Sequence, residues 1–272
     1  EKKVLGKIFP ENGGYQEGVD LLNMLAHHPS TAKFICKKLA IRFVSDQPSQ
    51  ALIDEMSKTF LNKDGDIKEV LITMVNSPEF WSKSSVRQKT KSPFELVISA
   101  LRALDVKVNL PFQVFQQLNK MGQKIYYYQA PTGFPDRADY WINTGALINR
   151  MNFGIAVASK QIRGSRFDIL KLNNDHEPEN VEAALRTYAA ILMPERDLEP
   201  TVKRLLPLLN DPSLQKKLLN SADSLNNKSK EDAESMELDD LFSDGEPSPK
   251  MDMNTLAQVV GIIIGSPEFQ RR

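Results

Sequence analysis

The stretch TAKFICKKLAIRF, residues 31–43, decides the fold class, because its apolar residues recur at the spacing of one face of an α-helix. This stripe consists of Ala32, Ile35, Cys36, Leu39, Ala40 and Phe43. The same spacing returns in residues 67–75 and 181–192, whereas no segment alternates apolar and polar residues over the length of a strand. The sequence therefore predicts an all-α protein without a sheet, a multi-helix array that forms a single domain.

Prolines after small polar residues mark the corners between these helices. Ser77-Pro78, Ser92-Pro93, Asp211-Pro212 and Ser266-Pro267 combine an N-cap oxygen with a proline that tolerates the first helical position. The tetrapeptide Ser-Pro-Glu-Phe begins at residues 77 and 266, and we interpret both copies as the same helix-break-helix corner. The predicted helices are 17–27, 30–44, 48–61, 66–76, 78–83, 92–105, 111–121, 137–160, 178–193, 199–210, 212–221 and 253–265.

Two stretches interrupt the helical pattern. Residues 222–252 are rich in Ser, Asn, Asp and Glu and poor in large apolar side chains, which predicts a disordered acidic insertion. We therefore expect a helical domain at 1–221 and a C-terminal helix, 253–272, that packs back on it. Residues 122–136 contain glycines, prolines and three consecutive tyrosines, which predicts one aromatic loop.

The overall charge excludes a general attraction to polyanions. Lys plus Arg and Asp plus Glu each number 35, so we expect no nucleic-acid partner. The apolar runs are too short to cross a bilayer, so we expect no membrane span. The chain begins with Glu1 and shows no leader, from which we expect a fragment or a processed product.

No catalytic or metal-binding motif stands out. The run 62–66 resembles a calcium loop, but its spacing puts Phe60 and Leu71 at ligand positions, so we favour a turn that delivers Asp66 as a helix cap. His28 is favoured as a helix-boundary residue, although a role with groups outside this chain stays open. Cys36 lies on an apolar helix stripe, where a thiol is usually inert. We therefore predict no metal site and no cofactor, and leave open whether the protein is an enzyme.

A basic connector and the aromatic loop are the remaining candidates. Lys83, Arg87, Lys89 and Lys91 are expected to form a solvated linker rather than an anion site. The aromatic loop is expected mainly to close the core, but rings beside polar groups also suit a sugar, a peptide or a partner surface. The candidate binding residues are Gln123, Tyr127, Thr132, Asp136, Trp141 and Arg150, together with His28.

Several segments together resemble the bacterial family called domain of unknown function 1800. The matching motifs are Asp20-Leu21-Leu22 to His28-Pro29, Thr31 to Ile35 with Lys38-Leu39 and Phe43-Val44, Lys91 to Val97 with Arg102-Ala103-Leu104, Gly122-Gln123 through Pro131 to Phe134 and on to Trp141, Asn143 and Arg150, and Ser266 to Gln270. They cover most of residues 4–158 and the C-terminal helix.

The resemblance implies a setting more than a reaction. Members of that family are exported, largely helical proteins, which implies a periplasmic, outer-surface or secreted location. They are often encoded beside family 1501, which is similar to sulfatases and phosphatases. The chain is expected to lack the N-terminal half of its relatives, which includes a tryptophan- and histidine-rich segment.

Two functions follow as expectations. The first is a helical scaffold or binding module of the bacterial cell envelope, whose partner is an exported sulfatase-like or phosphatase-like protein or an envelope polysaccharide. The alternative is an envelope hydrolase-like enzyme whose active site needs the absent N-terminal half.

Overall fold

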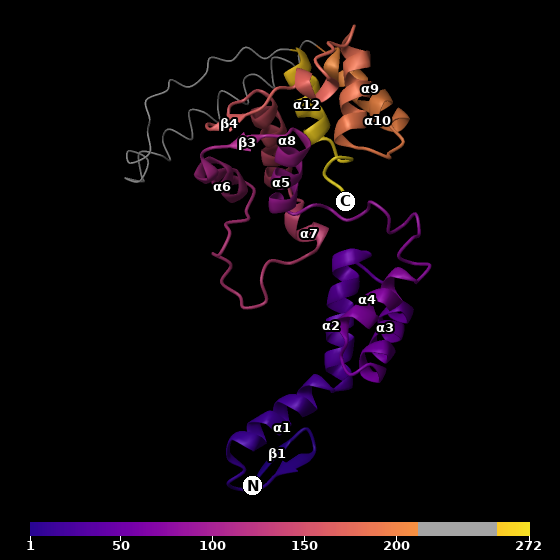
Figure 1. The fold of residues 1–272 in the computed structure, drawn as a ribbon, viewed down its shortest axis with the longest axis vertical. Coiled ribbons are helices and arrows are strands. Elements are labelled where there is room, and N and C mark those ends of the chain that lie inside the picture. The colour runs from indigo at the N-terminus through magenta and orange to yellow at the C-terminus, as the bar shows by residue number, and fades with distance from the viewer. Residues whose placement is uncertain (212–254) are drawn as a thin grey trace, which may run out of the picture. The chain divides into compact units, whose positions relative to one another are not determined.

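The computed structural model describes residues 1–211 and 255–272, and these fall into two compact units, 1–89 and 90–272 (Figure 1). The predicted acidic insertion, 222–252, and the predicted helix 212–221 lie outside the described residues. The domain boundaries expected from the sequence, 1–221, 222–252 and 253–272, stay a prediction.

Three helices of the first unit enclose its core. The unit consists of β1 (Lys2–Val4), β2 (Lys7–Phe9), α1 (Gly14–Ala26), α2 (Pro29–Phe43), α3 (Gln50–Asn62) and α4 (Ile67–Val75). Cys36 of α2, Met56 of α3 and Val70 of α4 are fully buried in one apolar cluster. The predicted stripe of α2 therefore faces this core, except that Phe43 is exposed.

The second unit has the larger core and combines segments that are distant in sequence. It consists of α5 (Pro93–Ala103), β3 (Lys107–Val108), α6 (Pro111–Lys120), α7 (Ala138–Trp141), α8 (Thr144–Ala158), β4 (Ser165–Arg166), the 3₁₀ helix η1 (Leu170–Asn173), α9 (Val181–Leu192), α10 (Glu199–Leu209) and α12 (Thr255–Gly265). α12 packs against α8 and α9, as Figure 1 shows in yellow. Tyr188 of α9 is buried, and its hydroxyl donates to the Ile169 carbonyl at 3.2 Å.

α8 and α12 approach each other along glycines. A Cβ atom on Gly154 would lie 2.6 Å from the Gly261 carbonyl oxygen and 2.9 Å from the Gly265 nitrogen. A Cβ atom on Gly261 would lie 3.1 Å from the Cα atom of Ile155. At Gly154 only a hydrogen atom fits, and at Gly261 a Cβ atom would be tight, so the two backbones themselves are in contact.

The two Ser-Pro-Glu-Phe segments form the same turn, but no helix follows in residues 78–83 or 267–272, so the predicted helix-break-helix corner is right about the break and wrong about the second helix. The amides of Ser77 and Ser266 donate back to the last turns of α4 and α12, at 3.1 and 3.0 Å. The amides of Phe80 and Phe269 then donate to the two serine hydroxyls, each at 3.3 Å. Each serine therefore caps a tight turn that ends a helix.

The all-α prediction is confirmed, and three details of it are wrong. Two short antiparallel ladders, β1–β2 and β3–β4, occur where no sheet was predicted, because strands of two or three residues are too short for an alternating pattern. Residues 78–83 form turns rather than a helix. The predicted helix 137–160 is interrupted after Trp141, because Asn143 is extended and caps α8 by accepting from the Ala146 amide.

Among the described residues, no helix combines the length and the apolarity that a membrane crossing requires.

Candidate functional site

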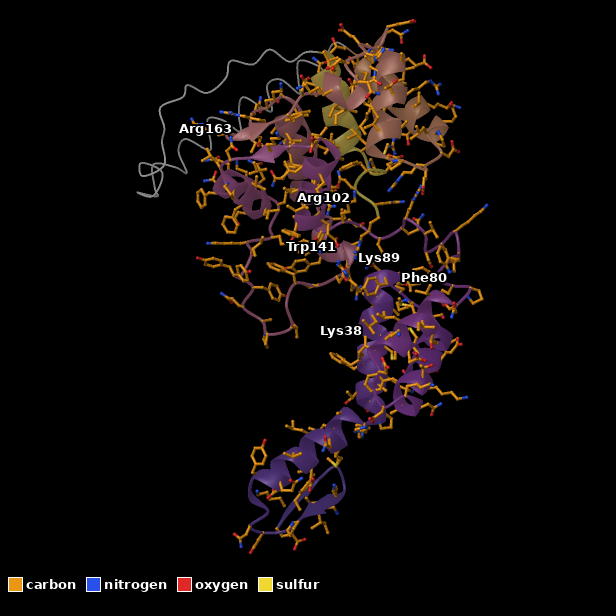
Figure 2. All side chains as sticks on the ribbon, in the orientation of Figure 1. Lys38, Phe80, Lys89, Arg102, Trp141 and Arg163 are labelled. Atoms are coloured by element: carbon orange, nitrogen blue, oxygen red, sulfur yellow. The ribbon has the colours of Figure 1, made fainter. Side chains whose placement is uncertain are left out.

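The aromatic loop of the second unit is built on a chain of ring contacts. The ring centroids of Tyr128 and Phe134 are 4.6 Å apart, and those of Phe134 and Trp141 are 5.6 Å apart. Tyr140 completes the chain edge-on to Trp141 at 4.7 Å. Trp141, labelled in Figure 2, is only 4% exposed. Its ring is therefore buried against Phe134 and Tyr140, but it belongs to neither apolar cluster of the described residues, so core closure by this loop stays a prediction.

Two tyrosines of the loop point to solvent instead. Tyr126 is 99% exposed and Tyr127 is 65% exposed. Tyr126 also has a φ of +66°, a conformation that non-glycine residues seldom adopt. The ammonium group of Lys124 lies 3.6 Å from the centroid of the Tyr127 ring, a cation–π contact. The loop thus presents aromatic surface that the fold does not use.

Polar side chains fix the base of this loop to α5. The Gln123 amide oxygen accepts from the Phe94 backbone amide at 2.7 Å, which satisfies a free donor in the first turn of α5. Asp136 pairs with Arg272 at 3.4 Å, and Arg272 also pairs with Glu95 at 2.9 Å. Glu95 belongs to the predicted capping box with Ser92, which the structure confirms.

Arg150 belongs to α8 in the second unit and is fully buried. Its guanidinium donates to the Lys91 carbonyl at 2.8 Å and to the Gln270 side-chain oxygen at 3.2 Å. Burial lowers the pKa of Arg150 to about 10, and the negative charge of Glu95 acts in the opposite direction. Arg150 therefore stays charged at neutral pH and joins three chain segments, rather than reaching a ligand at the surface.

Lys91 is the titratable group whose environment is most unusual in this region. Burial, followed by repulsion from Arg196, lowers its pKa to about 8. Its ammonium donates to the Ser99 hydroxyl at 3.1 Å and lies 4.1 Å from the centroid of the Phe269 ring. A neutral lysine amine can activate a neighbouring hydroxyl as a nucleophile by accepting its proton. The Ser99 hydroxyl, however, donates to the Leu96 carbonyl at 3.0 Å, so its proton does not point to Lys91.

The expected solvated linker is wrong for two of its lysines. Lys89 is only 5% exposed and pairs with Asp46 inside the first unit, and Lys91 is partly buried in the second. The sequence offers no signal for this burial, because the covering residues, such as Phe269, are far away in the chain.

The first unit holds the remaining sequence candidates. His28 is the N-cap of α2, because its Nδ1 atom accepts from the Ser30 amide at 3.1 Å. Asp66 caps α4 by accepting from the Lys68 amide at 2.8 Å, as the turn interpretation predicts. Cys36 is buried, and this burial raises its pKa, which keeps the thiol protonated.

A pair that the sequence did not indicate links the end of α1 to the turn before α4. His27 Nδ1 lies 2.7 Å from the Asn23 carbonyl oxygen, and its Nε2 contacts Asp64. The carbonyl and then the carboxylate raise the pKa of His27, because both partners favour the doubly protonated ring. Within residues 1–211 and 255–272, no three His, Cys, Asp or Glu side chains are grouped as metal ligands.

The structure brings together some of the predicted site residues. Gln123 and Asp136 fix the loop, Trp141 lies beneath it and Tyr127 lies on it, while Thr132 is an exposed residue of the same loop. Arg150 is buried and bonds to Lys91 and Gln270 instead, and His28 belongs to the other unit. The sequence missed Tyr126, although it stands in the run of three tyrosines.

Comparisons with known proteins give a family but no activity. A search of curated proteins and a search of solved structures each found no match. The family model described as "Protein of unknown function (DUF1800)" matches residues 1–271. The match includes α9 and α10, which the motifs recognised in the sequence did not cover. The chain therefore belongs to the DUF1800 family.

Proposed function

We propose that this protein is a non-catalytic binding module of the bacterial cell envelope that holds an exported protein partner against its aromatic loop. The aromatic loop supports this role because its base is held in place by polar contacts while its tip is exposed. Gln123 and Asp136 anchor the loop, yet Tyr126 is 99% exposed and Tyr127 65% exposed. Exposed tyrosines on a preorganised support lose little entropy on binding and are typical of interface hot spots.

The exposed residues that follow the loop tip in sequence favour a protein over a polysaccharide. Between residues 126 and 151 the exposed large apolar side chains, here called the exposed apolar set, are Tyr126, Tyr127, Tyr140, Ile142, Leu147, Ile148 and Met151. Aliphatic and methionine side chains offer no hydrogen bonds to hydroxyl groups, whereas apolar residues with tyrosine characterise protein interfaces. The envelope location and the sulfatase-like or phosphatase-like nature of the partner rest on the family resemblance.

The proposal is tested by purifying the intact chain with an exported sulfatase-like or phosphatase-like protein of the kind encoded beside members of its family, and measuring their affinity. The double substitution Tyr126→Ser, Tyr127→Ser should weaken binding at least about tenfold. Tyr15→Ser is the matched control, because Tyr15 is 89% exposed but lies on α1 of the first unit. It should leave the affinity unchanged.

Three results would contradict this function. The first is no measurable complex with that partner protein, and the second is an equal loss of affinity in the control. The third is retention of envelope polysaccharide without protein, which would support the other expected partner. The hydrolase-like alternative stays a prediction, tested by turnover of ester, phosphate and glycoside panels by the full-length protein.

A further inference from the structure

A pocket between α6 and α8 is independent of the aromatic loop. The space between its walls measures about 460 Å³, including the part open to solvent. Four carboxamide side chains, Gln117, Asn149, Asn152 and Gln161, share the walls with Phe153, Ala156, Ile162 and one charged residue, Lys120.

The backbone fixes where these side chains lie. Asn149, Asn152 and Phe153 follow the spacing of one face of α8, while Leu147 and Met151 of the exposed apolar set lie on the opposite face. The Asn149 amide group also donates to the Lys120 carbonyl at 2.6 Å, which ties the end of α6 to α8.

The end of α8 places the fourth carboxamide. Lys160 has a φ of +58°, and the Gln161 amide donates back to the Ala156 carbonyl at 2.9 Å. These are features of a Schellman motif, which directs the chain back across the last helical turn. In Figure 2 this region can be found by the label of Arg163, which follows Gln161 by two residues.

One polar atom at this pocket lacks a partner in the described structure. Gln161 Nε2 is buried and has no hydrogen-bond acceptor. A buried amide donor without an acceptor costs free energy, and a ligand oxygen would remove that cost once the Gln161 side chain rotates to present Nε2 to the pocket. This partnerless donor points to a ligand independently of the shape of the pocket.

We propose that this pocket binds a neutral sugar ring. Carboxamides are uncharged and act both as donors and as acceptors, and sugar hydroxyls have the same dual character. Phe153, Ala156 and Ile162 provide apolar wall for the C–H face of the ring. The inference does not rest on the proposed protein partner, because the two surfaces use different residues of α8.

The test measures binding of free monosaccharides to the intact chain by ligand-observed saturation-transfer NMR and calorimetry. The probes are glucose, galactose and N-acetylglucosamine, with glucuronate as a charged probe and N-acetylglycinamide as a peptide probe. Neutral sugars should bind, and Gln161→Met and Gln117→Met should each weaken binding about tenfold or more. Gln113→Met is the matched control on α6, outside the pocket wall, and should bind as the parent does.

Thermal melting separates a lost site from a lost fold. Gln161→Met removes a partnerless amide, so the variant should melt no lower than the parent. If Gln161→Met does not fold, Gln117→Met provides the second pocket variant. Three results would overturn the proposal: no binding of any neutral sugar, which would leave a pocket filled by water, preferential binding of glucuronate or of the peptide probe, or equal weakening in Gln113→Met.

Discussion

Replacing Gly154 by alanine tests whether the contact between α8 and α12 holds the second unit together. The new Cβ atom would lie 2.6 Å from the Gly261 carbonyl oxygen and 2.9 Å from the Gly265 nitrogen. Both are backbone atoms, so no side chain can rotate away and α12 must move.

The expected magnitude is a balance of two terms. Overpacking of this kind costs about 1–3 kcal/mol, whereas alanine gains up to about 1 kcal/mol over glycine inside a helix. The free energy of unfolding of the second unit should therefore fall by about 1–2 kcal/mol. Gly145→Ala is the matched control in the same helix, because the nearest atom to its Cβ would be Asn143 Oδ1 at an ordinary 3.6 Å. This control should lose no stability.

The assay is urea unfolding followed by tryptophan fluorescence in a Trp81→Phe background. The chain has two tryptophans, so Trp141 then reports alone, and it is buried in the second unit. A Gly154→Ala variant as stable as its parent would refute the reasoning, because it would mean that the helices can separate without cost. An equal loss in Gly145→Ala would attribute the effect to α8 alone.

Three other perturbations test the charged groups. Arg150→Met leaves the Lys91 carbonyl without its partner and should destabilise the second unit by about 1–3 kcal/mol. Hydrogen exchange at the Lys91 amide, which donates to the Gln270 carbonyl at 2.8 Å, should then accelerate. Unchanged protection of this amide would mean that Arg150 does not hold the segments of Lys91 and Gln270 together. Lys91 has a folded pKa of about 8 against 10.5 when unfolded, so the unfolded chain binds more protons between these values and stability should rise with pH there, by up to about 3 kcal/mol. Lys91→Met should abolish that rise in urea midpoints, and a rise of the same size in the variant would assign it to other groups. Because the pKa of His27 is raised in the folded state, its link to Asp64 stabilises the fold fully below the unfolded pKa, and this stabilisation is lost as the pH rises through the folded pKa. NMR titration should show a lower His27 pKa in Asp64→Asn than in the parent. An equal pKa would exclude the Asp64 carboxylate as a cause of the shift.

Local sequence signals predicted the helices and several of their ends. The capping box of Ser92 and Glu95 and the cap at Asp66 can be recognised because all participating atoms lie within four residues. The apolar stripe of α9 is buried as its spacing predicts, since a helix has one periodicity whatever it packs against.

Features that depend on distant residues could not be predicted. The close approach at Gly154 requires Gly261, and the burial of Lys91 requires Phe269. Four carboxamides at the α6–α8 pocket are unremarkable in sequence, because Gln117 and Gln161 become neighbours only through the packing of α6 on α8. In the aromatic loop the sequence identified the rings, but only the structure separates buried Trp141 from exposed Tyr126.

The glycine contact between α8 and α12 also has a consequence for the order of events during synthesis. α8 is complete at Ala158, but its partner surface ends only at Gly265. A ribosome must therefore add about a hundred residues, at roughly 5–20 residues per second, before the face around Gly154 can be covered. For those seconds the nascent chain carries an uncovered apolar helix, which a chaperone can bind, and the second unit can complete its core only as its last helix emerges.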